Sequence, residues 1–383
     1  MRVVHLNSML KGGGTDEQCL ALTRGLLQLE QAVWLAGLDG RPLISAAQSL
    51  GIPLHTTPVE GPLKLRLILS VARFLRREQI QILHAHHGRD YWPAVLAARL
   101  SGVKTKVVIS RHLAKSPGSA LSRGWLLSQC DALVAVSEFT AHVLREGHYE
   151  PDSPEPERHA RPPMRGDHAK IHVVPCGIDT DQFQPGDGSR LRHEWGLLPE
   201  HYAFAVVGGY DHPRGKGQRE FLAVAARIHQ DIPQARFLIV GRGTLEPVLM
   251  DDIQRLGLAG KAWLTPYCTD MPQAMNALDC LVHPAIGTEA FGLVVLEAFA
   301  CGKPVIAAAL DGIPEAFAAG NHGTLVRPES PEELAQAMIW WANQQPKDLA
   351  GRRELHQRIA IGYSYQMAAR KLLQVYRTIQ SEL

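Results

Sequence analysis

The stretch CLVHPAIGTEAFGLVVLEAFACGKPVIA (residues 280–307) contains one complete unit of an α/β fold. Two short apolar runs, Cys280–His283 and Val305–Ala307, predict buried strands. Between them, Phe291–Ala300 is nearly all apolar and predicts a buried helix. A strand, a helix and a second strand in this order predict a parallel βαβ crossover.

The same alternation of apolar runs and helical patterns continues along the chain in two series. The first series of candidate strands is Val3–Leu6, Val33–Ala36, Ile80–His84, Val107–Ile109, Leu133–Val136 and Ile171–Val174. The second series is Phe204–Val207, Phe237–Val240, Ala262–Leu264, Cys280–His283, Val305–Ala307 and Thr324–Val326. We therefore expect an α/β protein with two facing Rossmann-like, doubly wound domains and an interdomain cleft.

The length of the chain, 383 residues, suits two domains with separate cores. We expect the first over residues 1–185 and the second over residues 186–362, because a Pro- and Gly-rich break (residues 183–189) separates the two series. Residues from about 150 to 170 are rich in Pro, His and charge, and predict an exposed loop in the first domain. Apolar residues at helical spacing predict a last helix from about Tyr365 to Ile379.

Composition excludes several classes of protein. Hydrophobic residues make up 45% and charged residues 20%, as in ordinary globular chains. The net charge of +2 gives no reason to expect a nucleic-acid partner. We find no membrane-spanning run, no signal peptide and no zinc-like pairing of the six cysteines, and expect a cytoplasmic protein with buried thiols. His86 and His87 do not predict a metal site, because adjacent side chains at a strand end diverge.

Glycine-rich turns follow the first strand of each series. Residues Gly12–Gly14 join a strand to a helix, so they form either an anion-binding turn or simply a tight turn. Thr15 and Gln18 fit a capping box at the start of that helix. In the second series, residues Gly208–Gly217 do not have the spacing of a Walker motif, which disfavours an ATPase.

The second turn carries Arg214 and Lys216, which suit a diphosphate; the alternative is a solvated basic turn. In the deciding stretch, Glu297 lies inside an apolar helix, where a carboxylate needs hydrogen-bond donors from the protein or from a ligand. Glu289 precedes that helix and could merely cap it. The same helix start offers the amides of Phe291, Gly292 and Leu293 to an anion.

These motifs bring out a resemblance. The stretch from Glu289 to Glu297, two glutamates with seven residues between them around Phe-Gly, resembles the signature of glycosyltransferase family 4. Other segments also resemble that family, in order along essentially the whole chain: Ile82–His86, Val107–His112, Val134–Ser137, Val174–Asp179 with Phe183, and Gly302–Ala307 with Asp311–Glu315.

The resemblance implies a GT-B fold and a retaining glycosyltransferase of the hexosyltransferase class that needs no metal and no cofactor besides its nucleotide-sugar donor. The last helix, residues 363–383, would cross back to the first domain. By the same resemblance, Glu297 matches the glutamate that binds ribose, and Glu289 and His112 match residues near the donor sugar. The amides of Phe291, Gly292 and Leu293, together with Lys216, Gly13 and Gly14, match groups around the donor phosphates.

Two positions depart from the family pattern. Many members carry arginine where Gly209 stands in the donor site, and Arg214 is the candidate replacement. Cys176 stands where asparagine is common. We assign Lys216, Arg214, Glu289 and His112 to catalysis, with charge stabilisation on the departing phosphate as the largest contribution.

The acceptor is less well defined than the donor. A basic amphipathic stretch, residues 63–77, indicates either peripheral contact with an anionic membrane, which suits lipopolysaccharide or other envelope glycan synthesis, or an ordinary crossover helix. Arg111, His112, Lys115 and Arg123 face either a phosphorylated acceptor or water. Alternative functions are a nucleotide-sugar epimerase or hydrolase of the same fold, and a catalytically weak nucleotide-sugar-binding protein.

Overall fold

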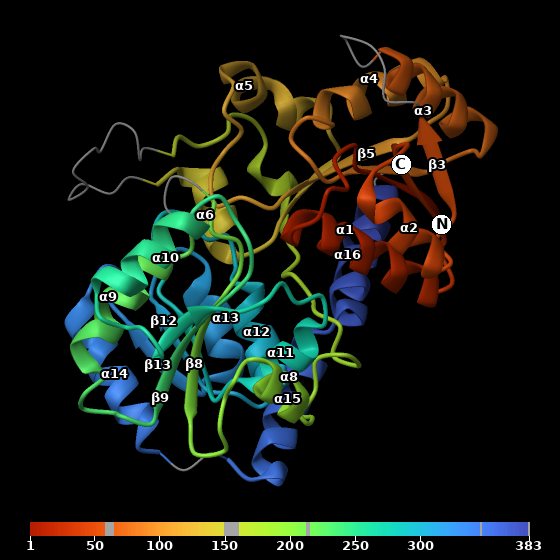
Figure 1. Cartoon of the computed structure of the whole chain (residues 1–383). Helices are drawn as coiled ribbons and strands as arrows, with labels where there is room; N and C mark the ends of the chain where they lie inside the picture. The colour runs from red at the N-terminus through yellow and green to blue at the C-terminus, as the bar shows by residue number, and fades with distance from the viewer. Residues whose placement is uncertain (58–64, 149–160, 212–214, 345–346, 382–383) are drawn as a thin grey trace. The chain divides into compact units, whose positions relative to one another are not determined.

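The computed structural model consists of two compact units (Figure 1). It describes residues 1–57, 65–148, 161–211, 215–344 and 347–381. Unit 1 comprises Met1–Gly177 and Tyr365–Leu383, and unit 2 comprises Ile178–Ser364. The expected boundaries, 185/186 and 362/363, thus differ from those of the compact units.

Backbone hydrogen bonds explain why the first boundary lies earlier than expected. The amide of Ile178 donates to the carbonyl of Tyr363, and the amide of Gly186 donates to Oδ1 of Asn276. Asn276 also donates to the carbonyl of Gln184. These bonds attach residues 178–186 to unit 2, although no regular element runs through them.

Unit 1 contains a seven-stranded parallel sheet in the order β3-β2-β1-β4-β5-β6-β7. Its strands are β1 (Arg2–Leu6), β2 (Ala32–Leu38), β3 (Leu54–Thr57), β4 (Ile82–Ala85), β5 (Lys106–Arg111), β6 (Ala132–Ala135) and β7 (Ile171–Val173). Its helices are α1 (Gly14–Gln28), α2 (Pro42–Ser49), α3 (Leu65–Arg77), α4 (Tyr91–Ser101), α5 (Ala120–Gln129), α6 (Glu138–Glu146), the 3₁₀ helix η1 (His168–Lys170) and α16 (Tyr365–Ser381).

Unit 2 contains a six-stranded parallel sheet in the order β10-β9-β8-β11-β12-β13. Its strands are β8 (Tyr202–Val207), β9 (Ala235–Val240), β10 (Ala262–Leu264), β11 (Cys280–His283), β12 (Val305–Ala308) and β13 (Gly323–Val326). Its helices are α8 (Ser189–Glu194), α9 (Gln218–Ile228), α10 (Glu246–Arg255), α11 (Met271–Ala277), α12 (Leu293–Ala300), α13 (Ile313–Gly320), α14 (Pro331–Ala342) and α15 (Leu349–Tyr363). The expected α/β fold with two Rossmann-like parallel sheets is confirmed.

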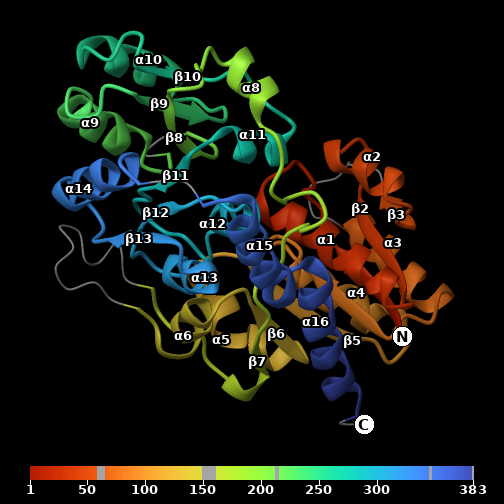
Figure 2. The same ribbon diagram turned by 90° about the horizontal axis from the view of Figure 1, so that it is seen from below.

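Helix α16 belongs to unit 1 and lies alongside α1 (Figure 2). Its buried face carries Leu372, Leu373 and Tyr376, which pack in one core with Leu26 of α1 and Val3 of β1. Gly25 of α1 allows the close approach, because a Cβ there would lie 2.6 Å from the Cβ of Ala369. The helix thereby covers apolar surface that the first 177 residues of the chain leave exposed.

The exposed loop expected from about residue 150 to 170 is only partly tested, because residues 150–160 lie outside the described ranges. In the remainder, the expectation is wrong for two side chains. Met164 is buried in the core of unit 1, and its amide donates to the carbonyl of Leu144. Arg161 is buried and donates to the carbonyl of Ala114. This segment therefore helps to close the core beside α6.

No helix in the described ranges is both long and apolar enough to cross a bilayer. Five of the cysteines are buried and Cys268 is half-buried; all six are free thiols.

Candidate functional site

The candidate site of unit 2 lies at the carboxyl ends of β8, β11 and β12. The order of the sheet reverses between β8 and β11, and ligands of open parallel sheets bind at such switch points. The loop after β8 carries Lys216, the loop after β11 carries Glu289, and the loop after β12 carries Asp311. Side chains far apart in sequence therefore meet at one edge of the sheet.

Lys216 and Glu289 form an ion pair at this edge. Nζ of Lys216 lies 2.6 Å from Oε2 of Glu289, whose side chain is 17% exposed. Burial raises the pKa of Glu289, but the neighbouring Lys216 and His283 and a hydrogen bond from Lys216 outweigh burial, so the pKa is lowered overall. Glu289 is therefore an anion at neutral pH that holds a cation beside the glycine turn.

The backbone of Glu289 is fixed by the loop after β12. Its amide donates to Oδ2 of Asp311, and its carbonyl accepts from the amide of Gly312. A Cβ at Gly312 would lie 2.1 Å from the carbonyl oxygen of Ala290, so only glycine permits the two loops to meet this closely. Glu289 thus does more than cap a helix, because it ties three loops together.

His283, the last residue of β11, lies behind the ion pair. Its Nε2 is 3.8 Å from Oε2 of Glu289, and neither ring nitrogen has a hydrogen-bond partner within the described part of the chain. Burial lowers the pKa of His283 to about 4; Glu289 raises it and Lys216 lowers it further. The ring is therefore neutral at pH 7, and its polar atoms border the site.

The glycine turn after β8 is held by Gln218, which is fully buried at the start of α9. Its Oε1 accepts from the amide of Lys216, and its Nε2 lies 3.5 Å from the carbonyl of Gly209. Gly217 adopts φ +88°, and a Cβ there would lie 2.0 Å from the carbonyl oxygen of Pro284.

Arg214 lies outside the described residues. At Gly209, by contrast, the nearest atom to an added Cβ would be the carbonyl oxygen of Arg242, at 3.7 Å.

The helix expected at Phe291–Ala300 begins at Leu293, with Gly292 as its N-cap in the left-handed region (φ 93°). The amide of Val295 donates to the carbonyl of Gly292, but the amides before it have no intrahelical acceptor at a helix start, which makes this end suited to an anion. The expectation that Glu297 is buried is wrong, since this side chain is half-buried. Glu297 lies on a partly exposed face of the helix together with Leu293 and Val294. Because the helix is almost wholly apolar, its sequence does not reveal which face is exposed.

In unit 1, Gly13 and Gly14 are exposed at the end of β1, and Gly13 is the N-cap of α1. The expected Thr15–Gln18 capping box is wrong, because no side chain caps this helix. The buried carboxylate of Asp16 instead accepts from the amides of Lys11 and Gly12. Gln18 exchanges two hydrogen bonds with the backbone of Gly177. The turn therefore carries its own carboxylate, which satisfies two amides.

Four histidines gather at the switch point of unit 1, between β1, β4 and β5. The rings of His5 and His84 lie on either side of the Tyr376 hydroxyl, at 3.1 Å and 2.5 Å. The ring of His86 stacks on that of His84 at 4.2 Å between centroids, and His112 follows at 5.6 Å from His86. Burial is the main cause that lowers the pKa of each ring, to about 3 for His5 and His112. The column is neutral at pH 7.

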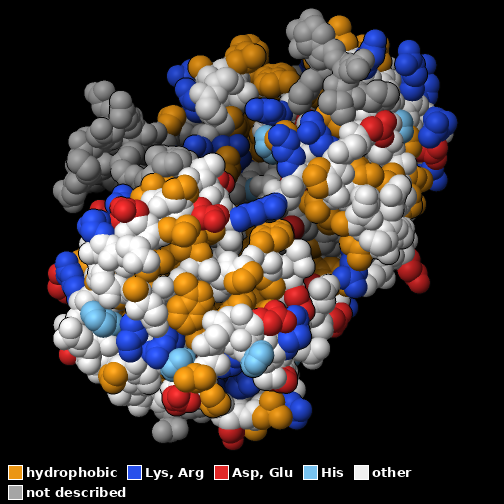
Figure 3. All heavy atoms as spheres, viewed as in Figure 1, with side chains coloured by type: hydrophobic (Ala, Val, Ile, Leu, Met, Phe, Trp, Pro, Cys, Tyr) orange, Lys and Arg blue, Asp and Glu red, His pale blue; other side chains and the backbone are white. Residues whose placement is uncertain are grey.

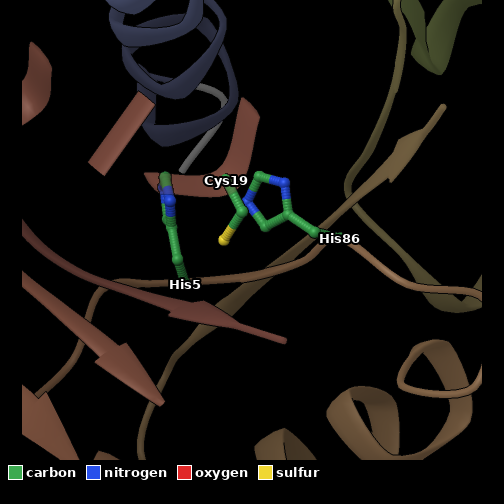
Figure 4. A group of neighbouring side chains, drawn as sticks. All are labelled: His5, Cys19 and His86. Carbon is green, nitrogen blue, oxygen red and sulfur yellow. The ribbon is translucent and has the colours of Figure 1, made fainter. Parts of the chain in front are cut away.

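His5, Cys19 and His86 offer possible metal ligands, with ligand atoms within 4.8 Å of one another (Figure 4). Both nitrogens of His5 already have partners, Thr23 at Nδ1 and Tyr376 at Nε2. Burial also raises the pKa of the Cys19 thiol, which disfavours the thiolate that a metal binds. The cluster thus fits a hydrogen-bonded core better than a metal centre.

Three cations expected near a phosphorylated acceptor belong to β5, to the loop after it and to α5. Arg111 is buried and donates to the carbonyls of Lys115 and Ser116, and Arg123 donates to the carbonyls of Pro117 and Gly118. These two arginines shape the loop after β5. Lys115 is exposed, and His112 is half-buried.

Sequence reasoning missed three residues of the unit 2 site: His283, Gln218 and Asp311. The polar residue that ends the apolar strand Cys280–His283 is a signal that could have revealed His283. Gln218 accepts from an amide of its own turn and Asp311 from an amide of another loop, and the sequence around these two residues carries no such signal.

Two parallel-sheet units, with the Lys216–Glu289 ion pair at the switch point of the second, define a protein of two Rossmann-like domains. Residues 201–344 match the model of "Glycosyl transferases group 1", and residues 12–154 match that of "Glycosyltransferase Family 4". A D-inositol 3-phosphate glycosyltransferase of Segniliparus rotundus is 30% identical over 85% of this chain and 75% of its own. The chain belongs to glycosyltransferase family 4.

Two solved structures show the same fold. HepE of Anabaena, in complex with UDP-glucose, aligns with a TM-score of 0.78 and 19% identity over the full length of both chains. The lipopolysaccharide outer core galactosyltransferase WaaB aligns with a TM-score of 0.70 and 14% identity, also over both full lengths.

Proposed function

We propose that the protein transfers a sugar from a UDP- or GDP-sugar to a glycan or glycolipid acceptor with retention of anomeric configuration. The observation that carries the proposal is the Lys216–Glu289 pair at the switch point of unit 2, next to the amide end of α12. A cation and free helix amides suit the diphosphate, and a carboxylate suits sugar hydroxyls. The bound UDP-glucose of HepE supports a nucleotide-sugar donor.

In this proposal, Lys216, with Arg214, and the amides of Phe291, Gly292 and Leu293 bind the diphosphate. Glu297, half-exposed on α12, binds the ribose. Glu289 and, from unit 1, His112 contact the sugar, and Gly13 and Gly14 contact the phosphates. No metal is assigned a role, because these protein groups supply the positive charge.

The reaction breaks the bond between the anomeric carbon and the β-phosphate oxygen and forms a bond from that carbon to the acceptor oxygen on the same face. The departing phosphate takes the proton of the acceptor hydroxyl, since the two carboxylates of the proposed site, Glu289 and Glu297, are assigned to the sugar and the ribose. Lys216 and the α12 amides stabilise the negative charge that grows on the phosphate.

Two observations bear on the acceptor. The Segniliparus relative acts on D-inositol 3-phosphate, whereas WaaB acts on lipopolysaccharide. Arg111 and Arg123 are already engaged by backbone carbonyls, which weakens the case for a phosphate beside them. We therefore retain an envelope glycan or glycolipid as the first acceptor class and a phosphorylated cyclitol as the second.

A surface of unit 1 supports contact with anionic membrane. Helices α3 and α4 pack together and contain no acidic residue. Leu65 and Leu69 of α3 are exposed beside the arginines of the same helix, and Leu96 and Leu100 of α4 are exposed too. Figure 3 shows Lys and Arg side chains along the edge of unit 1 that carries these helices, beside the residues drawn in grey. Residues 63 and 64 of the expected stretch lie outside the described residues.

Co-sedimentation tests this contact. Vesicles of phosphatidylglycerol should retain the protein at low salt, and Arg66→Glu/Arg73→Glu should release it. An Arg227→Glu/Arg255→Glu variant of unit 2 serves as the control. Equal retention of all three proteins, or of none, would remove the membrane from the proposal.

The donor is tested by calorimetry against UDP, GDP, ADP and their common sugar conjugates without added metal. Binding of one nucleotide supports the proposal and identifies the base. Product formation is then followed with lipopolysaccharide core acceptors and with D-inositol 3-phosphate. Donor consumption without an acceptor would instead favour a hydrolase or epimerase, and binding without turnover would favour the weak-binding alternative suggested by Gly209.

A further inference from the structure

His86 lies in the column of histidines, yet one of its nitrogens has no partner. Its side chain is 1% exposed, and Nε2 makes no hydrogen bond to any described residue. Its Nδ1 lies 3.4 Å from Nε2 of His112, the residue that follows β5. The ring is held in place by stacking on His84, at 4.2 Å between centroids.

The position of the proton on His86 follows from this environment. A neutral imidazole carries one N–H and one bare nitrogen. A buried N–H without an acceptor is rarer and more costly than a bare lone pair without a donor. The proton of His86 therefore belongs on Nδ1, where His112 can accept it.

The same reasoning fixes the tautomer of His112. Because its Nε2 accepts from His86, the proton of the neutral ring is on Nδ1. A ring in this state donates through Nδ1 and has no lone pair there to take up a proton. The half-buried His112 can thus offer a hydrogen bond to a ligand oxygen but cannot act as a base through that nitrogen.

The hydrogen bonds of His5 and His84 can be assigned consistently without His86. The hydroxyl of Thr23 donates to the carbonyl of Cys19, so it accepts from Nδ1 of His5. Nε2 of His5 then accepts from Tyr376, whose oxygen accepts from Nδ1 of His84. Nε2 of His84 in turn accepts from Ser110. Every nitrogen of His5 and His84 is satisfied, which leaves His86 to pair with His112.

We propose that His86 is a positioning residue that holds His112 in the Nδ1–H tautomer, so that His112 donates a hydrogen bond to a hydroxyl oxygen of the transferred sugar. The role toward the sugar rests on the proposed function; the tautomer rests on unit 1 alone. His112 then orients the sugar and does not deprotonate the acceptor.

The test is a long-range ¹H–¹⁵N spectrum of the full protein labelled at histidine, recorded at pH 7.5 without nucleotide. The signals of His112 are identified by their loss in His112→Gln. The expected pattern has a protonated Nδ1 and an unprotonated Nε2. A protonated Nε2 in the wild-type protein would overturn the proposal.

Two variants of His86 test whether this residue fixes the tautomer of His112. His86→Asn keeps an N–H donor close to the position of Nδ1 and should preserve the pattern. His86→Leu removes the hydrogen-bond donor to His112. The spectrum of this variant should therefore show His112 exchanging between its two tautomers. An unchanged pattern in His86→Leu overturns the proposal. If that variant does not fold, the wild-type and His86→Asn spectra still decide.

The spectra are recorded without nucleotide, so they do not depend on whether the nucleotide-sugar donor binds. Failure of every nucleotide to bind would overturn the proposed function while leaving the tautomer as measured. Conversely, the wrong tautomer would overturn the role of His86 while leaving donor binding intact.

Discussion

The amino group of Lys216 lies 2.6 Å from Oε2 of Glu289, across 73 residues of sequence. This contact joins the loop after β8 to the loop after β11 and neutralises the cation that we assign to the diphosphate. A diphosphate carries more negative charge than one carboxylate, so it can compete for Lys216. Donor binding is then expected to free Glu289 for the sugar hydroxyls.

Lys216→Ala should lower turnover on the order of 10²-fold, as the loss of other charge-stabilising donors does. Steady-state kinetics with the donor found by calorimetry measures the effect. Lys261→Ala, at the opposite end of the sheet before β10, is the matched control and should keep normal turnover. Wild-type turnover in Lys216→Ala would show that this lysine has no part in catalysis.

Glu297→Gln should weaken binding of the nucleotide about tenfold, because hydrogen bonds to a charged group contribute about 1.5–3 kcal/mol. Calorimetry with the nucleotide diphosphate alone measures it, which separates ribose contacts from sugar contacts. Glu332→Gln, on the exposed start of α14, is the control. Equal affinity in all three proteins would leave Glu297 with a structural role only.

Substitution by alanine should destabilise the protein at one glycine of the turn after β8 and not at another. Gly217→Ala should lower the free energy of unfolding by about 1–3 kcal/mol, because it combines φ +88° with a 2.0 Å contact. Gly209→Ala should stay within about 0.5 kcal/mol of the wild type, since its surroundings are open. Urea unfolding compares them. A large loss in Gly209→Ala would contradict the space seen there.

Gly209→Arg extends this comparison to function. The variant introduces the arginine that many family members carry, at a position where an added Cβ would have its nearest atom 3.7 Å away. We expect it to fold and to bind the nucleotide diphosphate more tightly than the wild type by calorimetry, because it adds a cation. Unchanged affinity would indicate that the missing charge is already supplied elsewhere.

Stability should fall as the pH is lowered from 7.5 to 5.5. The rings of His5 and His112, with pKa values lowered to about 3 chiefly by burial, stay neutral in the folded protein over this range. The unfolded chain takes up protons near pH 6.5, so it is favoured by acid. Each such proton contributes up to about 1.4 kcal/mol per pH unit.

Urea unfolding at pH 7.5, 6.5 and 5.5 measures this dependence. His112→Gln should reduce the slope by about one proton relative to the wild type. A stability that does not change between pH 7.5 and 5.5 would contradict the neutral column.

Tyr376→Phe should lower the free energy of unfolding by about 1–3 kcal/mol for each nitrogen left without a partner, on His5 and His84. Tyr365→Phe is the matched control on the same helix, since its hydroxyl accepts from Gln28, whose contact is part-buried and involves no histidine. Urea unfolding of both variants compares them. Equal losses would show that the hydroxyl between the histidines contributes nothing particular.

Strands buried on both faces could be predicted from the sequence. Cys280–His283 has the expected bounds because a central parallel strand covered by helices is apolar along nearly its whole length. Strand Leu54–Thr57 was missed because it lies at the edge of its sheet and is half polar.

The site could be predicted only in part. Lys216 and Glu289 each stand out locally, but their ion pair depends on the order of the strands. His86 was set aside as a metal ligand, yet its contact with His112 arises from the adjacent ends of β4 and β5, which no local pattern reveals.

Helix α16 sets an order of events during protein synthesis. The core of unit 1 needs Leu372, Leu373 and Tyr376, which the ribosome makes almost two hundred residues after β7. Unit 2 is one continuous segment and can reach its native contacts sooner. Unit 1 is made first, but one face of its sheet stays uncovered until α16 has been synthesised. Chaperones have their longest opportunity to bind during this interval.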